Sequence, residues 1–269
     1  YSVIRVKKDV LEKSYVGFIA TNVSPGKAAS NQAYGVDFLY RTDRFMRKQN
    51  FEFGGYMAEN RAEGLRRGNH AGRVLMNLPN DAYSVSLLYH EVGANYNPET
   101  GFVRRRNIRQ HHAEFTLTPR PGIPGVKKLL FTPLNMDYYT DTGSRLVSRT
   151  TNFEPFGIEF NSGDTVILKV YGSYELVNNT FERFRGKMKV PQGGHTWWDY
   201  EFEVITSDNR PVNVGIHAHT GTFYNGDRDY VLTQFGLKTS KYYSLSTDYT
   251  MQRIRSEEHT SELQSPNTI

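Results

Sequence analysis

The chain has 269 residues, with 33 Lys and Arg against 28 Asp and Glu, 18 Tyr, 16 Phe and no Cys. So many aromatic packing groups, at a formal net charge of only +5, exclude a disordered chain. The lack of Cys excludes disulfide frameworks, thiolate metal sites and Cys nucleophiles. No apolar stretch approaches the roughly 20 residues of a membrane-spanning helix, whereas the weaker alternating pattern of membrane β-strands stays possible.

Alternation of apolar and polar residues predicts β-strands along almost the entire chain. In residues 196–206, TWWDYEFEVIT, the side chains of Trp198, Tyr200 and Phe202 share one face, and three acidic side chains share the other. No segment of ten residues or more shows helical periodicity. In chain order, the predicted strands are residues 2–9, 14–22, 33–41, 50–59, 72–78, 83–91, 112–118, 128–139, 151–160, 165–175, 181–190, 196–206, 211–222, 230–238 and 242–252.

Turn residues separate these runs, as in Pro79-Asn80-Asp81 and Asn225-Gly226-Asp227. About fifteen strands of about ten residues, joined mostly by short turns, predict an antiparallel meander. Residues 91–110 and 118–126 are irregular, and we expect them to form loops outside the regular sheet. No shift in composition divides residues 1–254, which predicts one domain.

The length of the strands favours a membrane barrel. Strands of soluble sheets are usually about 5–6 residues long, whereas a strand that crosses a bilayer needs about 9–11. Tyrosines toward segment ends, such as Tyr83 with Tyr89 and Tyr243 with Tyr249, are typical of interfacial aromatic girdles. We therefore expect an all-β meander that closes into a large outer-membrane-type β-barrel with a charged lumen. A soluble β-sandwich or soluble barrel with an aromatic core is the alternative.

Residues 255–269, RSEEHTSELQSPNTI, break the aromatic alternation. They resemble the in-frame translation of a common sequencing-library adapter, so we expect an artefactual tail and exclude it from the fold. Without its one Arg and three Glu, the formal net charge rises from +5 to +7. The chain also opens within a predicted strand and without an initiator Met. We therefore expect the domain of residues 1–254 to be N-terminally truncated.

Five segments carry a resemblance to a known family: SVIRVKKDVLEKSYVGF (2–18), AYGVDF (33–38), EVGANYNPETGFVRRRNIR (91–109), VPQGGHTWWDYEFEVITSDNRP (190–211) and GTFYNGDR (221–228). Over nearly all of residues 1–254 the chain resembles uncharacterised bacterial proteins with an N-terminal family-9-like carbohydrate-binding module. In that family a C-terminal domain of unknown function, similar to an outer-membrane β-barrel, follows the module. The resemblance implies that the module precedes residue 1, that the protein lies in the bacterial outer membrane against its lipid, and that glycans are reached through the absent module.

Arg104, Arg105, Arg106 and Arg109 form the densest basic cluster. Guanidinium groups bind carboxylates and phosphates bidentately, so this cluster could hold lipopolysaccharide phosphate, an acidic glycan or a carboxylate of a docked domain. Alternatively, these arginines line the lumen and pair with the acidic residues of the 196–206 strand. No recognition motif accompanies the charge, so nucleic acid is not an expected partner.

Asp199, Glu201 and Glu203 are weak candidates for glycosidase carboxylates, since alternate residues of any strand satisfy the required spacing of roughly 5–10 Å. His217 and His219 share a face, but a metal site would need further ligands such as His195, Asp199 or Glu201. Polar groups of a lumen are the favoured interpretation, so we expect no metal and no cofactor.

The leading hypothesis is an outer-membrane barrel domain that acts as anchor, scaffold or conduit for a carbohydrate-binding surface or periplasmic protein. No catalytic step is evident, because the sequence has no G-x-S-x-G, H-E-x-x-H or P-loop motif. Two alternatives remain open. One is a glycan hydrolase that uses the carboxylates of residues 196–206, and the other is a soluble carbohydrate-binding module with Trp197 and Trp198 as sugar platforms.

Overall fold

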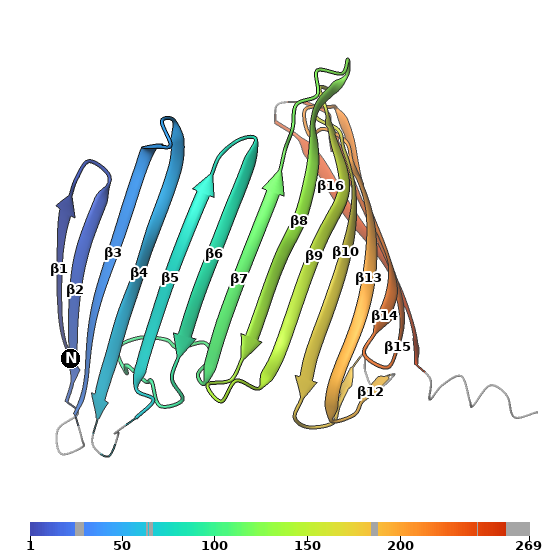
Figure 1. The fold of residues 1–269 in the computed structure, drawn as a ribbon. Coiled ribbons are helices and arrows are strands. Elements are labelled where there is room, and N and C mark those ends of the chain that lie inside the picture. The colour runs from blue at the N-terminus through green and yellow to red at the C-terminus, as the bar shows by residue number, and fades with distance from the viewer. Residues whose placement is uncertain (25–29, 63, 65–66, 184–187, 241, 257–269) are drawn as a thin grey trace, which may run out of the picture. The chain divides into compact units, whose positions relative to one another are not determined.

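A computed structural model describes residues 1–24, 30–62, 64, 67–183, 188–240 and 242–256, and within them every regular element is a β-strand (Figure 1). No helix in this part of the chain is long and apolar enough to cross a membrane. The strands are β1 (Ser2–Val10), β2 (Ser14–Val23), β3 (Asn31–Phe45), β4 (Gln49–Ala62), β5 (His70–Pro79), β6 (Tyr83–Val92), β7 (Ile108–Leu117), β8 (Val126–Thr140), β9 (Leu146–Phe160), β10 (Thr165–Val177), β11 (Phe181–Arg183), β12 (Met188–Val190), β13 (Gly193–Ile205), β14 (Val212–Phe223), β15 (Gly226–Lys238) and β16 (Ser244–Ser256).

Fourteen strands form one sheet in the order β1-β2-β3-β4-β5-β6-β7-β8-β9-β10-β13-β14-β15-β16. Neighbouring strands such as β1 and β2, β2 and β3, or β10 and β13 pair antiparallel, which confirms the predicted meander. Strands β1 and β16 stand at the two ends of this order, and their described partners are β2 and β15. The strands of the sheet have 9 to 15 residues, longer than the usual strand of a soluble sheet.

One predicted strand is wrong. The described parts of the predicted 181–190 strand, residues 181–183 and 188–190, do not belong to the large sheet. Instead β11 and β12 pair with each other, with Phe181 opposite Val190, as a separate two-stranded ribbon. Residues 184–187 of the predicted strand lie outside the described residues. Alternation of apolar residues is the same in one continuous strand and in two arms of a ribbon, so the pattern could not distinguish them.

The predicted tail falls mostly outside the described residues. Strand β16 continues to Ser256, so the first two residues of the tail are part of a strand, and residues 257–269 are not described. The predicted loops correspond to residues 93–107 and 118–125, which separate β6 from β7 and β7 from β8. The predicted turn at Asn225-Gly226 is displaced by one residue, since Tyr224 and Asn225 connect β14 to β15.

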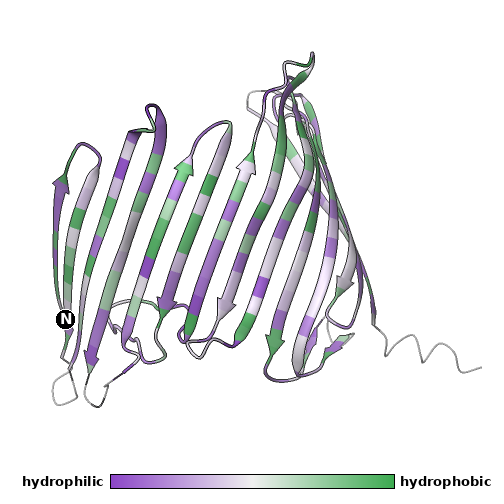
Figure 2. Ribbon diagram, viewed as in Figure 1, coloured by the Kyte–Doolittle hydropathy of each residue, from purple (hydrophilic) through white to green (hydrophobic). Residues whose placement is uncertain are grey.

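Strand β13 exposes apolar side chains on one face and buries charged ones on the other. In β13, Trp198, Tyr200 and Phe202 are 47%, 50% and 49% exposed, whereas the three acidic residues between and beyond them are only 4–6% exposed. Strand β3 repeats the arrangement, with exposed Tyr34 and Val36 on either side of a buried Gly35. Apolar and polar residues alternate along the strands (Figure 2). The buried face of these strands is therefore the polar one.

The chain divides into two compact units. Unit 1 comprises Tyr1–Phe115 and Met136–Val147, and its apolar cluster joins Ala71, Val92 and Ile108. Unit 2 comprises Thr116–Asn135 and Ser148–Ile269. Its apolar cluster consists of Val177, Met188, Val190, Phe223 and Tyr224, with Phe181, Trp197 and Ile254 packed against it. In unit 2 the β11–β12 ribbon thus packs its apolar side chains against residues at the ends of sheet strands, such as Val177 of β10 and Phe223 of β14.

We predict that Met188→Ala destabilises unit 2 by about 2–5 kcal/mol, because Met188 is fully buried and truncation leaves a cavity. Denaturant unfolding followed by tryptophan fluorescence would report it, since Trp197 packs on the same cluster. Met57→Ala is the matched control, because Met57 is 67% exposed. Equal losses in the two variants would contradict the assignment of a core to the ribbon.

A second prediction concerns Asp164, outside the strands. Its carboxylate accepts hydrogen bonds from the Ser207 amide (2.9 Å) and the Ser162 hydroxyl (2.8 Å) and pairs with Arg210. The Ser207 amide, with these other partners, holds the pKa of Asp164 below its ordinary value of 3.8. A lowered pKa stabilises the fold above about pH 3.8, and this stabilisation is lost as the pH falls through the folded-state pKa.

Asp164→Asn should therefore lower stability at pH 7 and flatten the decline in stability below pH 5. Parallel denaturant titrations of the variant and the parent chain between pH 3 and pH 7 would measure this. Curves of the same slope would show that Asp164 does not contribute to acid sensitivity.

Candidate functional site

Unit 2 holds an ionic row on the buried face of β10, β13, β14 and β15. We define the ionic row as Lys169, Tyr171, Asp199, Glu201, Glu203, His217, His219 and Arg228. Alternate residues of a strand point to one face, so β13 contributes three acids and β14 contributes two histidines to the same surface. The register places Lys169 opposite Glu201 and Glu201 opposite His219, which brings the side chains of β10, β13 and β14 together.

Each acid of the ionic row has a partner on a neighbouring strand. Lys169 Nζ lies 2.6 Å from Glu203 and 3.7 Å from Glu201. The Tyr171 hydroxyl donates to Glu201 at 2.6 Å. Burying a carboxylate is costly unless it is paired and hydrogen-bonded, so these contacts explain how β13 can bury its acids.

The partners of Asp199 come from β14 and β15 rather than from β10. Its Oδ2 lies 2.9 Å from His219 Nδ1 and 3.1 Å from the Arg228 guanidinium. The His219 ring also stacks on Tyr171, with 6.3 Å between the ring centroids. Two permanent cations, Lys169 and Arg228, and two imidazoles thus face the three carboxylates of β13. All these partners lie within unit 2, and Asp199 Oδ1 and Arg228 Nε are the two atoms of the row that are buried without a hydrogen bond among the described residues.

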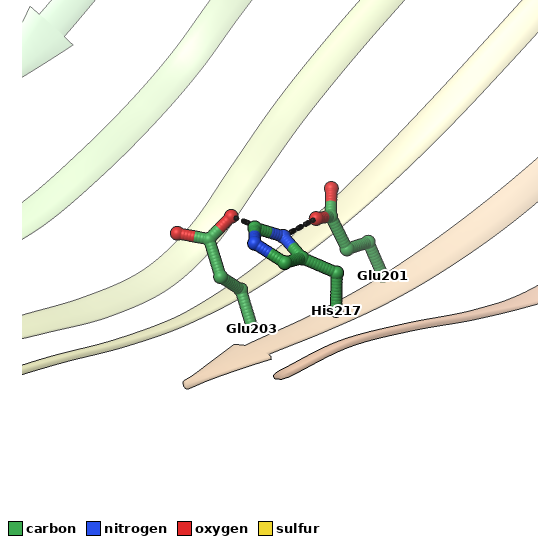
Figure 3. Close-up of side chains that lie close together, drawn as sticks. All are labelled: Glu201, Glu203 and His217. Carbon is green, nitrogen blue, oxygen red and sulfur yellow. Dashed lines mark hydrogen bonds and ion pairs between the residues drawn. The ribbon is translucent and has the colours of Figure 1, made fainter. Parts of the chain in front are cut away.

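Three members of the ionic row have the donor atoms of a metal site. Glu201, Glu203 and His217 each offer one ligand atom, and these atoms lie within 4.8 Å of one another (Figure 3). His217 Nδ1 is 3.0 Å from Glu201 and 3.3 Å from Glu203. Two carboxylates and an imidazole are ligands that Zn²⁺ accepts. An ion there would have to displace the ammonium of Lys169 from Glu203, so the contacts fit a structural ion-pair network better.

His195, considered as a candidate further ligand, contacts other residues. Its Nε2 is 2.8 Å from the Pro191 carbonyl, and its ring lies 5.6 Å from that of Tyr224. The acids considered as glycosidase residues, Asp199, Glu201 and Glu203, are the members of the ionic row described above. Ion pairing to neighbouring strands accounts for their position.

The two tryptophans point to opposite faces of β13. Trp197 packs against Tyr224, with ring centroids 4.5 Å apart, and belongs to the apolar cluster of unit 2. Trp198 is half-exposed on the other face. The two rings therefore do not form one sugar-binding platform.

The basic cluster of unit 1 separates into three environments. Arg109 pairs with Glu91 at 3.0 Å and donates to Ser144 at 3.2 Å. Arg106 donates to the side chain of Asn97. Arg104 and Arg105 instead line a cavity of about 1090 Å³ in unit 1. Sequence analysis considered these four arginines as one basic cluster. In the structure, only Arg104 and Arg105 of the four line the cavity.

Sequence reasoning missed Lys169, Tyr171 and Arg228 in the ionic row and Arg73 in the cavity. Alternation alone could place these side chains on the polar face of their strands, but the neighbouring strand has to be known to find their partners.

No protein-family model, curated protein or solved structure matches this chain. Functional inference therefore rests on the geometry.

We predict that Lys169→Met destabilises unit 2 by about 3–5 kcal/mol, because it leaves two buried carboxylates without their ammonium. Glu203→Gln should cost less, since Lys169 keeps Glu201 as a partner. The double variant should be more stable than Lys169→Met alone, because one uncompensated charge is removed. Denaturant unfolding of the four proteins would give the coupling energy, and additive losses would contradict a coupled pair.

Proposed function

We propose that residues 1–254 are the transmembrane barrel domain of a bacterial outer-membrane protein. The domain serves as anchor, scaffold or conduit for a carbohydrate-binding surface or periplasmic protein. The observation that carries this proposal is the inverted burial of β13, with half-exposed Trp198, Tyr200 and Phe202 and buried acids. Lipid solvates apolar side chains, so a membrane barrel has an apolar outer face and a polar interior.

Water would favour the opposite arrangement. Monomeric soluble proteins rarely expose contiguous apolar patches larger than a few hundred Å². Here neighbouring strands of unit 1 expose Phe18, Val36 and Met57, which follow one another in register across β2, β3 and β4. An apolar band that continues from strand to strand is what the outer face of a barrel needs.

Closure is the second requirement of the proposal. Unpaired backbone groups at a sheet edge are not tolerated in lipid, so the ends of the sheet must pair. In the proposed barrel, β1 and β16 therefore pair with each other or with further strands of the natural protein. The strand lengths of 9 to 15 residues support the proposal, because about 9–11 residues cross a bilayer.

The domain should insert into membranes when the chain is exported behind a signal peptide. We expect it in the outer-membrane fraction, resistant to extraction with urea, and with a mobility on electrophoresis gels that changes on heating. A soluble hydrolase or carbohydrate-binding module would be recovered in the periplasmic extract without detergent, and that result would overturn the proposal.

Tyr200→Arg tests the outward face directly. An Arg on the lipid face destabilises a membrane barrel by about 2–4 kcal/mol near the bilayer centre, whereas a water-exposed site tolerates it within about 0.5 kcal/mol. Tyr242→Arg is the matched control, because Tyr242 is exposed outside the strands. Refolding into lipid vesicles should fail or weaken for the first variant only. Equal refolding of the two variants would place the aromatic face in water.

A further inference from the structure

The loop between β6 and β7 is fixed on the buried face of unit 1. We call residues 93–107 the inner loop (Figure 1, teal). Its Asn97 amide donates to Asn60 Oδ1 at 2.9 Å, and the Asn97 carbonyl accepts from Asn31 at 2.9 Å. Tyr96 and Val103 pack on the apolar cluster of unit 1. The inner loop is thus held across strands that are distant from it in the sequence.

A cavity of about 1090 Å³ lies between the inner loop and the sheet. This volume slightly exceeds the usual range of roughly 300–1,000 Å³ for small-molecule sites. Apolar and aromatic side chains make much of its wall, including Tyr56, Leu75, Val92 and Tyr96. A ligand with an apolar body would therefore find matching surface.

Three arginines line the same cavity, Arg73 of β5 and Arg104 and Arg105 of the inner loop. Arg105 lies over the ring of Tyr139, 5.7 Å from its centroid. Among the described residues, Arg73 and Arg104 have no ion pair and no hydrogen bond from their side chains. Asp37 is the one carboxylate among the described residues that line the cavity, and Arg5 already holds it through contacts of 2.5 and 2.8 Å. The cavity therefore carries positive charge that the protein does not neutralise.

The geometry points to a binding site for an amphiphilic anion, with its carboxylate or phosphate head on Arg73, Arg104 and Arg105 and its apolar body against the wall. Guanidinium groups bind both heads bidentately. A bare inorganic anion would leave most of the apolar wall uncovered. This inference rests on the proposed conduit function, since it names the class of ligand that the conduit would bind. Ligand binding is measured separately from membrane insertion, so the binding inference and the membrane proposal can each be overturned without the other.

The probes are 2-naphthoate and 2-naphthyl phosphate, which have one apolar body and the two possible heads. Neutral 2-naphthylmethanol and inorganic phosphate test each half of the ligand alone. Isothermal titration calorimetry uses the full chain in neutral lipid nanodiscs, with empty nanodiscs as the blank. If the chain stays in water without lipid, the same titrations are run in buffer. We expect one or both naphthyl anions to bind at least tenfold more tightly than either half-ligand.

Arg73→Gln, Arg104→Gln and Arg105→Gln should each weaken the anion about tenfold, a factor equal to about 1.4 kcal/mol. Arg73→Lys keeps the charge and should lose less. Arg253→Gln, a matched control on β16 that does not line the cavity, should bind as the parent chain does. Heat-dependent gel mobility, or circular dichroism in buffer, checks that each variant folds.

Three outcomes would overturn the inference. Equal binding of 2-naphthylmethanol would show a purely apolar cavity, and equal binding of inorganic phosphate would show a simple anion site. Unchanged affinity in folded Arg73→Gln, Arg104→Gln and Arg105→Gln would place the anion elsewhere.

Discussion

The sheet depends on pairing the charges that its strands turn inward. A strand that buries Asp199, Glu201 and Glu203 on one face is stable only where its neighbours supply cations and hydrogen-bond donors. Strand β10 supplies Lys169, and β15 supplies Arg228. These contacts fix the register, because a slip of one residue would turn every acid to the opposite face.

The two units meet this requirement to different degrees. In unit 2 the ionic row neutralises most of its own charge, and the β11–β12 ribbon provides an apolar core beside it. In unit 1 the inner loop instead brings two arginines to a cavity in which Asp37, the one carboxylate among the described lining residues, is already paired. Unpaired positive charge beside an apolar wall attracts an anionic ligand, whereas a row of ion pairs rigidifies the strands.

Much of the fold was predictable because strand alternation and turn chemistry are local properties. The long strands, the meander order and the loop near residues 93–107 followed from apolar spacing and turn residues. The ribbon at Phe181–Arg183 and Met188–Val190 did not, and this error had a consequence for the site. With a false strand inserted, β13 would have been paired with residues 181–190 rather than with β10.

The sequence by itself determined which side chains share a face, since that depends only on the period of two along a strand. Tertiary structure decided which strands are neighbours, and so it decided that Lys169 rather than a basic residue of the ribbon faces Glu203. It also separated the residues of the arginine cluster, because Arg109 forms an ion pair with Glu91 whereas Arg104 lines the cavity. Which strands pair depends on burial and charge compensation between residues that are distant in the sequence, and no local pattern encodes it.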